Sequence, residues 1–257
     1  MILSTPEDFL KIVEEWEDPN PLPIITEHNN IFVVRDDLLG GGSKLRFIDY
    51  MIKTWPYKEF VYGSSPATGY AQISFAKAAA RYGKKAVIFM AQRDMNKLHP
   101  YQQEAIASGA DMRWVPNGML SVTEKRAKDY VKEDPINRVL IPIGGDHVDV
   151  LACIVKVARY NIGMIPDEVW SVGSSGTLTR GLQLAWPTAN FNVVSVGHKG
   201  NYGRAKVYNC NIPFNKPTNI LPPFPSAPTY DAKAWEFIMK HKNTNLNKTT
   251  LFWNVGA

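Results

Sequence analysis

Short runs of apolar, β-branched residues alternate with amphipathic stretches along most of this chain. Runs of about four to eight such residues between turn residues are typical of buried strands, and apolar residues spaced three and four apart are typical of helices. Strands that alternate with helices form βαβ units, which build mostly parallel sheets covered by helices. The sequence therefore predicts an α/β fold. The predicted strands cover residues 31–35, 59–63, 86–90, 112–115, 138–143, 168–173, 192–196 and 250–253. The predicted helices cover residues 44–54, 70–82, 100–108, 121–133, 148–160, 176–186 and 230–241.

The charge balance is basic, with a formal net charge of +5 at pH 7 over 257 residues. This balance suits an anionic cofactor or substrate, and it also suits nucleic acid. The basic residues are scattered, however, and the densest groups, Lys125–Lys128 and Lys240–Lys242, lie in polar helical stretches that are typical of solvated faces. Hydrophobic residues make up 45% of the chain, which is enough for a packed core and argues against disorder.

Missing motifs narrow the class of protein further. No apolar run reaches the roughly 18 residues that a membrane span needs, and Met1–Trp16 is acidic and helix-periodic rather than a signal peptide. Cys153 and Cys210 form no CxxC motif and no disulfide framework. Asp146–Asp149 follows two glycines, a pattern more typical of a turn than of a metal site. We therefore expect a cytoplasmic protein without a metal ion and without membrane contact.

The segment Val172–Leu178 follows a predicted strand and opens a predicted helix. Its two glycines allow the backbone to approach an anion closely, and the first N–H groups of a helix have no partner within the helix. With the helix dipole and the hydroxyls of Ser174, Ser175 and Thr177, these N–H groups would form a phosphate cup. The alternative is an ordinary strand–helix turn capped by Ser or Thr. The segment is not GxGxxG and has no suitably placed acid downstream, which disfavours NAD.

Lys44 stands at the start of a predicted helix, directly after Gly40–Ser43. A lysine in such a place lies in a positive field, and burial would remove its solvation. Both effects lower the pKa of an amine and favour the neutral form that a Schiff base requires. The alternative is a surface lysine after a glycine-rich turn. The segment is not a Walker A loop, because the Gly-Lys-Ser/Thr order is absent.

Taken together and in this order, the two segments resemble those of the fold-type-II pyridoxal-phosphate (PLP) enzymes, the tryptophan synthase β-like family. Within that family the chain looks most similar to the branch of aminocyclopropanecarboxylate (ACC) deaminase and D-cysteine desulfhydrase. The resemblance covers nearly the whole chain, and it depends on an ordered set of segments rather than on one motif. The matching segments are Arg35–Arg46, Gly63–Gly83, Ile141–Gly145, Gly173–Leu178, Ala227–Ala234 and Leu251–Gly256.

The resemblance implies two lobes of parallel-rich sheet flanked by helices. A large cofactor-binding lobe would comprise residues 1–54 and 146–257, and a small lobe of residues 55–145 would be inserted into it. Relatives of this kind are usually dimers, so the resemblance also implies a homodimer.

The roles of individual residues also follow from the resemblance. Lys44 would form the Schiff base with the PLP aldehyde, and Asp231 would face the pyridine nitrogen and keep it protonated. Tyr230 would lie near the reacting carbon as an acid, base or nucleophile. The alternatives are a core tyrosine at a helix start and a helix-capping acid. The residues implied to hold the phosphate are Gly173, Ser174, Ser175, Gly176 and Thr177.

The loop that binds the substrate carboxylate departs from the family pattern. The family usually has Ser-Asn followed by His or Gln, whereas this chain has Gly69-Tyr70-Ala71, preceded by Ser65 and Thr68. The amide beside the cofactor ring is therefore missing, and Tyr70 would stack on the ring, supply a hydroxyl or block the pocket. The implied substrate-binding residues are Ser65, Thr68, Gly69 and Tyr70, and Tyr70 is also a catalytic candidate.

The leading functional prediction is a PLP-dependent lyase or deaminase that acts on a small amino acid or related amine through Lys44. A second is a PLP-dependent transferase or synthase that acts on an unusual amine, such as one attached to a nucleotide or nucleic acid. The altered loop and the basic charge motivate this alternative. A third is a catalytically degenerate homologue that serves as a binding protein.

Overall fold

The computed structural model describes residues 4–116, 118–197, 199–245 and 247–256. The chain divides into two compact units. The larger unit comprises Met1–Phe47 and Val148–Ala257, and the smaller unit is Ile48–His147. The inserted lobe was expected at residues 55–145, so the smaller unit also takes in the helix α3 (Asp49–Thr54).

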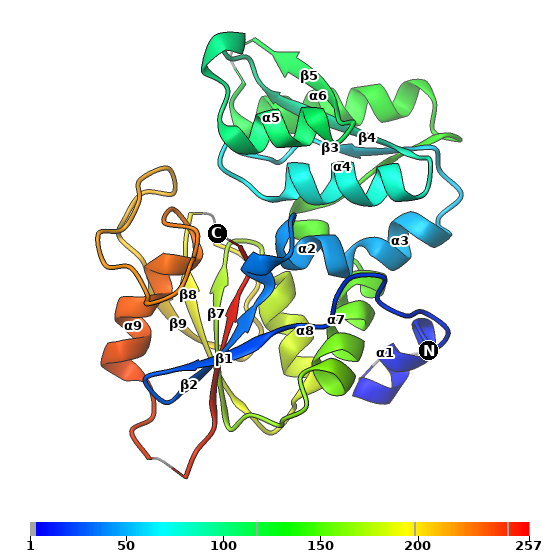
Figure 1. Ribbon diagram of the computed structural model, residues 1–257. Helices are drawn as coiled ribbons and strands as arrows, with labels where there is room; N and C mark the ends of the chain where they lie inside the picture. The colour runs from blue at the N-terminus through cyan, green and yellow to red at the C-terminus, as the bar shows by residue number, and fades with distance from the viewer. Residues whose placement is uncertain (1–3, 117, 198, 246, 257) are drawn as a thin grey trace. The chain divides into compact units, whose positions relative to one another are not determined.

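The larger unit is built on a six-stranded sheet with the order β1-β2-β10-β7-β8-β9 (Figure 1). β1 pairs antiparallel with β2, and every other pair in this sheet is parallel. The carboxyl ends of β2, β10 and β7 therefore lie side by side at one edge of the sheet. The strands are β1 (Ile25–His28), β2 (Ile31–Arg35), β7 (Glu168–Gly173), β8 (Asn190–Ser195), β9 (Lys206–Asn209) and β10 (Thr250–Asn254).

Helices cover both faces of this sheet, because alternate residues of its strands point to opposite sides. Trp170 of β7 belongs to the core cluster that includes Trp235 of α9. Its neighbour Ser171 bonds Thr179 of α8 on the other face, with 2.9 Å between the hydroxyl oxygens. The helices of this unit are α1 (Pro6–Ile12), α2 (Gly42–Phe47), α7 (Val148–Asn161), α8 (Thr177–Ala185) and α9 (Ala234–His241).

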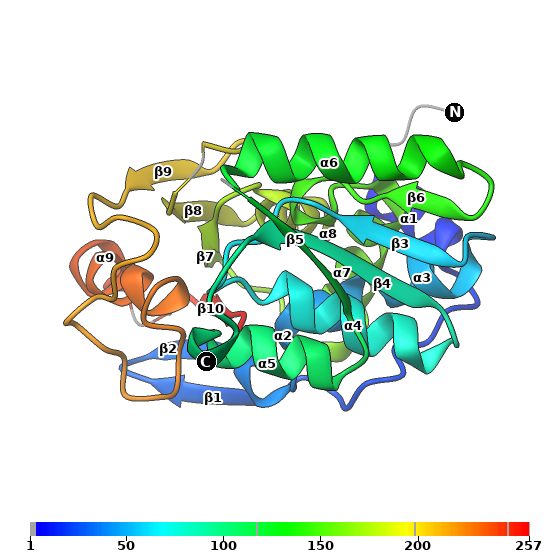
Figure 2. The ribbon, with the colours of Figure 1, turned by 90° about the horizontal axis from the view of Figure 1, so that it is seen from above.

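The smaller unit has a four-stranded parallel sheet with the order β5-β4-β3-β6. α6 packs on one face, where Val61, Val87 and Ala127 share a core cluster and where Figure 2 shows the helix running along the sheet. α4 covers the other face, where the ring of Phe75 lies 5.0 Å from that of Tyr62. The elements are β3 (Glu59–Tyr62), α4 (Ala71–Arg81), β4 (Lys85–Ala91), α5 (Pro100–Ala107), β5 (Asp111–Val115), α6 (Leu120–Glu133) and β6 (Arg138–Leu140).

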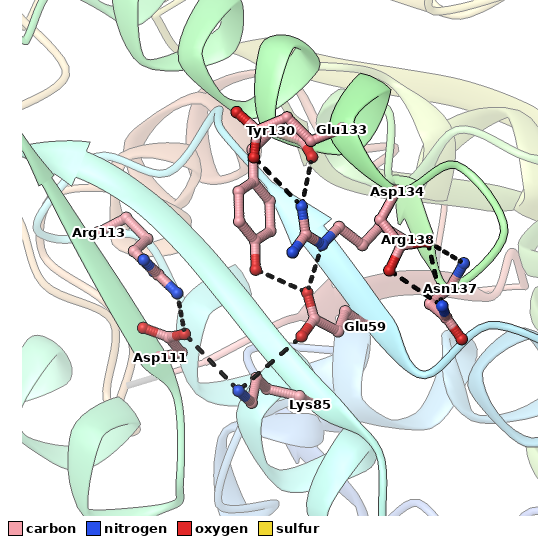
Figure 3. Close-up of polar contacts among 9 residues, drawn as sticks. All are labelled: Glu59, Lys85, Asp111, Arg113, Tyr130, Glu133, Asp134, Asn137 and Arg138. Atoms are coloured by element: carbon pink, nitrogen blue, oxygen red, sulfur yellow. Dashed lines mark hydrogen bonds and ion pairs between the residues drawn. The ribbon is translucent and has the colours of Figure 1, made fainter.

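Charged residues start each strand of the smaller sheet and alternate in sign across it. In sheet order these residues are Asp111, Lys85, Glu59 and Arg138, and we call them the amino-edge row. Glu59 binds Arg138 at 3.0 Å, and Lys85 lies 3.9 Å from both Glu59 and Asp111. Figure 3 shows Tyr130 of α6 beside the row, with the Arg138 guanidinium 3.7 Å from its ring centre. The row therefore links the starts of the four strands, and its Glu59 and Arg138 connect it to α6.

Two short strands and one helix break were not predicted from the sequence. β1 and β9 are edge strands of mixed composition, β1 half-buried and β9 mostly exposed, so they lack the apolar run that marks a buried strand. β1 joins β2 through Asn29 and Asn30, whose positive φ values of 53° and 58° suit a tight hairpin turn. The helix predicted over 44–54 is two helices, α2 and α3, which end and begin on either side of Ile48.

No helix among the described residues is both long and apolar enough to cross a bilayer. Over the same residues, no three His, Cys, Asp or Glu side chains group in a way that could hold a metal ion.

Candidate active site

The carboxyl edge of the larger sheet gathers most of the predicted site residues. β2 leads through a short 3₁₀ turn, Asp36–Leu38, to Lys44 on α2, and β7 leads into the Gly173–Thr177 loop. β10 lies between these two strands, and its Asn254 aligns with Arg35 of β2. Since neighbouring strands are about 4.8 Å apart, the ends of β2 and β7 are separated by about 10 Å.

α2 is fixed to the end of β10 directly before Lys44. The Ser43 backbone N–H donates to the Val255 carbonyl at 3.1 Å, and the Trp253 indole N–H donates to the Ser43 hydroxyl at 2.9 Å. Gly42 begins the helix with a φ of 67°, a left-handed conformation that a glycine adopts without steric cost. Lys44 is half-buried, and burial lowers its pKa to about 8. The amine is thus far closer to its neutral form at physiological pH than an ordinary lysine.

A buried cluster of charged side chains surrounds Arg46, which follows Lys44 by two residues in α2, and we call it the Arg46 cluster. The Arg46 guanidinium contacts the carboxylates of Asp36, at 2.9 Å, and Asp18, and it donates to the Pro21 carbonyl at 2.8 Å. The other oxygen of Asp36 accepts from the Trp253 indole at 3.0 Å. Burial alone would lower the pKa of Arg46, but the attraction of Asp36 and Asp18 outweighs it and raises the pKa. Arg46 therefore keeps its charge, although burial raises the pKa of Asp18 against the attraction of Arg46.

The Gly173–Thr177 loop forms the predicted turn between β7 and α8. Gly176 has a φ of 86°, and a side chain there would clash with the Asn201 carbonyl, so glycine is required. The hydroxyls of Ser175 and Thr177 lie 3.1 Å apart, and the Thr177 N–H points to the Ser175 hydroxyl at 3.4 Å. Ser174 is half-buried at the same turn. Hydroxyls and helix N–H groups thus converge at the start of α8, as an anion-binding turn requires.

Tyr202, in the segment after β8, holds this loop through hydrogen bonds and was not among the residues predicted from the sequence. Its hydroxyl donates to the Gly173 carbonyl at 3.0 Å and lies 2.8 Å from the Ser195 hydroxyl. The Asn201 backbone N–H donates to the Ser175 carbonyl at 3.2 Å. No local pattern marks Tyr202, because its partners lie in other segments of the chain.

Asp231 is a buried carboxyl group next to the same edge. Its Oδ2 accepts from the Gly256 backbone N–H at 3.2 Å, while its buried Oδ1 has no hydrogen-bond partner among the described residues. Burial raises the pKa of Asp231 well above the ordinary value, although the N–H groups of Val255 and Gly256 oppose the rise. These backbone donors do not offset the burial, and no cation among the described residues pairs with the carboxyl group.

Tyr230 precedes Asp231 and is half-buried against the core cluster of α9. Its hydroxyl donates to the Val172 carbonyl at 3.4 Å, one residue before the loop begins. Lys44, the Gly173–Thr177 loop, Tyr230 and Asp231 are thus all connected to the carboxyl ends of β10 and β7 within the larger unit.

The predicted substrate loop belongs to the smaller unit and is closed by its own hydrogen bonds. It joins β3 to α4, and Tyr70 stands directly before the first residue of that helix. The Gly69 N–H donates to the Pro66 carbonyl at 2.9 Å, and the Ser65 hydroxyl points to the same carbonyl at 3.4 Å. Ser65 is buried, and Thr68 is half-buried.

Comparisons with known proteins bear on the family. No protein-family model matches the chain. A glycyl-dTMP PLP-dependent decarboxylase of Pseudomonas phage M6 is 27% identical over 92% of this chain and 99% of its own. The crystal structure of an ACC deaminase homologue has a TM-score of 0.80 at 16% identity, over 96% of this chain and 94% of that one. Threonine deaminase isoform 2 of Solanum lycopersicum, in its processed form, has a TM-score of 0.72 at 14% identity, over 98% of this chain and 89% of that one.

These similarities confirm the predicted fold. The chain has the α/β fold of the fold-type-II, tryptophan synthase β-like PLP enzymes, with parallel-rich sheets flanked by helices.

Proposed function

We propose that this protein is a PLP-dependent enzyme and that Lys44 is the lysine that binds the cofactor aldehyde. The main support is that one sheet edge carries the three groups that PLP requires. They are an amine whose pKa is lowered to about 8, a glycine and hydroxyl turn at a helix N-terminus, and a buried carboxyl group with one oxygen that no described residue contacts by a hydrogen bond. When bound, PLP accepts the electron pair released as a bond breaks at the amine-bearing carbon of the substrate.

The residues of this edge fit the cofactor group by group. The N–H groups and hydroxyls of Gly173–Thr177 would hold the phosphate. Asp231 would accept a hydrogen bond from the protonated nitrogen of the pyridine ring. This bond would give Asp231 Oδ1 a partner and would offset the cost of burying the carboxylate charge. Lys44 would bind the aldehyde and, once displaced by the substrate amine, hold or deliver a proton at its Nζ.

For the reaction, we favour removal of the α-carboxylate from an amino acid attached to a pyrimidine nucleotide. The bond from the α-carbon to the carboxylate would break, CO₂ would leave, and a proton would take its place. The named relative is a decarboxylase of such a compound. Two donors of the substrate loop are also unavailable to a carboxylate. The Gly69 N–H and the Ser64 hydroxyl are engaged, the latter with Glu124 at 2.6 Å, and Tyr70 replaces the family asparagine.

A lyase or deaminase reaction on a small amino acid or related amine is the second candidate. Tyr230 favours it, because a phenol beside the phosphate turn is a proton donor or acceptor for elimination. The two reactions differ in product: one releases CO₂ and leaves the amine, and the other releases ammonia and a 2-oxo acid. The homodimer stays a prediction from the resemblance, and the cytoplasmic location stays a prediction from the sequence.

The cofactor proposal is tested by the Lys44→Ala variant. We expect the purified protein with PLP to show a visible absorption band that this variant lacks. Borohydride reduction followed by mass spectrometry should place the added mass on the peptide that contains Lys44. Lys53→Ala removes an exposed lysine and is the matched control. A colourless wild-type protein whose melting temperature does not rise with PLP would instead identify a degenerate homologue.

The pH dependence of PLP uptake tests the state of the amine. Only the neutral amine attacks an aldehyde, and the pKa of Lys44 is about 8. The rate at which the visible band forms should therefore rise as the pH increases through about 8 and level off above it. A rate that still climbs toward pH 10 would mean that the reacting lysine has an ordinary pKa.

A further inference from the structure

Gln72, in the first turn of α4, has a buried carbonyl oxygen that nothing in the described residues satisfies. The side chain is fully buried, and its Nε2 donates to the carbonyls of Ala67 and Gly69, both at 2.9 Å. These two donations fix the orientation of the amide, because a flipped amide would set oxygen against oxygen. The Oε1 atom is therefore an acceptor without a donor. A buried acceptor of this kind costs free energy unless a ligand supplies an N–H or O–H group.

Aromatic rings are grouped at the same loop of the smaller unit. The Tyr70 and Tyr101 ring centres are 4.6 Å apart, and the His99 ring lies 4.6 Å from that of Tyr101. All three side chains are half-buried, so each also keeps part of its surface exposed. Burial lowers the pKa of His99, which keeps this ring uncharged at neutral pH. Such a group offers π faces on which a planar base can stack.

No side chain of the loop carries a positive charge that would attract an anion. Ser64–Gln72 contains no basic residue, and the carboxylate of Glu124 on α6 lies 2.6 Å from the Ser64 hydroxyl. The Gly69 N–H is already bound to the Pro66 carbonyl. A neutral ligand with an N–H donor suits this environment better than a carboxylate or a phosphate does.

We propose that the Tyr70–Gln72 segment is a subsite for the pyrimidine base of the substrate, with Gln72 Oε1 accepting the ring N3–H of a thymine-type base and the aromatic group of Tyr70 and Tyr101 stacking on it. Enzymes that act on a base commonly combine hydrogen bonds to its Watson–Crick edge with aromatic stacking. This inference rests on the proposed nucleotide-linked substrate, and it assigns to the loop a base rather than a carboxylate.

The test measures the binding of three nucleotides to the full-length, PLP-loaded protein by titration calorimetry. We expect thymidine monophosphate to bind. N3-methylthymidine monophosphate, which lacks the donor, and deoxycytidine monophosphate, whose N3 is an acceptor, should bind at least about tenfold more weakly. Equal affinities for the three nucleotides would overturn the assignment of Gln72. This comparison changes the ligand only, so the fold of the protein is not at risk.

Two variants locate the contact. Tyr70→Ala should weaken thymidine monophosphate binding by about tenfold to a hundredfold, and Tyr70→Phe should bind like the wild type. In Gln72→Met, methylation of N3 should have no further effect, because the acceptor is gone. A full methylation effect in Gln72→Met, or wild-type affinity in Tyr70→Ala, would sink the subsite. If the visible PLP band is present but no nucleotide binds, the subsite fails alone, whereas the absence of the band refutes the proposed function.

Discussion

The carboxyl edge of the larger sheet and the amino edge of the smaller sheet both carry charged groups, but these groups differ in how far they are buried. In the Arg46 cluster, the side chains of Arg46, Asp36 and Asp18 are 2%, 0% and 7% exposed, and each is tied to several partners. In the amino-edge row, the Lys85 side chain is 52% exposed, and only Glu59 and Arg138 approach burial. The first set is shielded from water, whereas the second remains partly solvated.

The difference in burial determines how firmly each set of charged groups fixes the local geometry. A buried ion pair gains little net free energy over apolar packing, but removing one partner leaves a charge without compensation, so such a cluster holds one geometry firmly. Solvated pairs are screened and individually weak. Firm geometry occurs beside Lys44, where chemistry would need it. The edge with the row carries none of the predicted site residues and tolerates weaker contacts.

Replacing Arg46 by Leu is the change with the largest expected effect. It would leave the carboxylates of Asp36 and Asp18 buried without their cation, at a cost of about 3–5 kcal/mol in the free energy of unfolding. Hydrogen exchange of the β10 amides would report the loss within the larger unit. Arg46→Lys, which keeps the charge but not the forked geometry, should fall between the variant and the wild type. If Arg46→Leu cost less than about 1 kcal/mol, the buried cluster would behave like a surface pair, and the contrast between the edges would collapse.

Asp231 sharpens the comparison, because it is buried next to the carboxyl edge of the larger sheet and has no ion pair among the described residues. Its pKa is raised in the folded chain, so the folded state retains a proton that the unfolded state loses above the ordinary value of 3.8. Without cofactor, the contribution of Asp231 to stability should therefore be greatest below that value and fall by about 1.4 kcal/mol per pH unit until the raised pKa is passed.

Asp231→Asn should remove this slope from the pH profile of urea unfolding, and it should also weaken PLP binding. Asp167→Asn, at a carboxylate that an exposed lysine binds, is the control that should keep the slope. Identical profiles for Asp231→Asn and the wild type would show that Asp231 is not buried in a protonated form.

Arg138→Leu should have the smallest effect of the three. It removes a half-solvated pair with Glu59 and a stacking contact with Tyr130, which are together worth about 1 kcal/mol. Exchange of the β3 amides would measure it, and the loss should shrink further in high salt. A loss of stability as large as that of Arg46→Leu and independent of salt concentration would mean that the amino-edge row behaves like the buried cluster.

The elements and site segments that follow a local sequence pattern could be predicted. The eight predicted strands all occur, because each is an apolar run between turns, and the segments of Lys44 and Gly173–Thr177 are readable as short motifs. The edge strands β1 and β9 were not predicted, because half-buried or exposed strands carry no such run.

The supporting contacts of the site could not be predicted from the sequence in the same way. Trp253 binds Asp36 and Ser43 from the far end of the chain, and Tyr202 reaches back to Gly173 across β8. These contacts are set by which strands become neighbours, and periodicity does not contain that information. The unpartnered oxygens of Asp231 and Gln72 are likewise visible only once the surrounding groups are placed.

The position of β10 has a consequence for how the protein is made. This strand lies between β2 and β7, yet it follows every other strand in the chain. A ribosome would deliver the whole Ile48–His147 unit early enough for it to fold, while β2 and β7 waited without their shared neighbour. The larger sheet, and with it the contacts that fix α2, would be completed only when residues 250–256 emerged, so the facing edges of β2 and β7 would stay exposed until that moment.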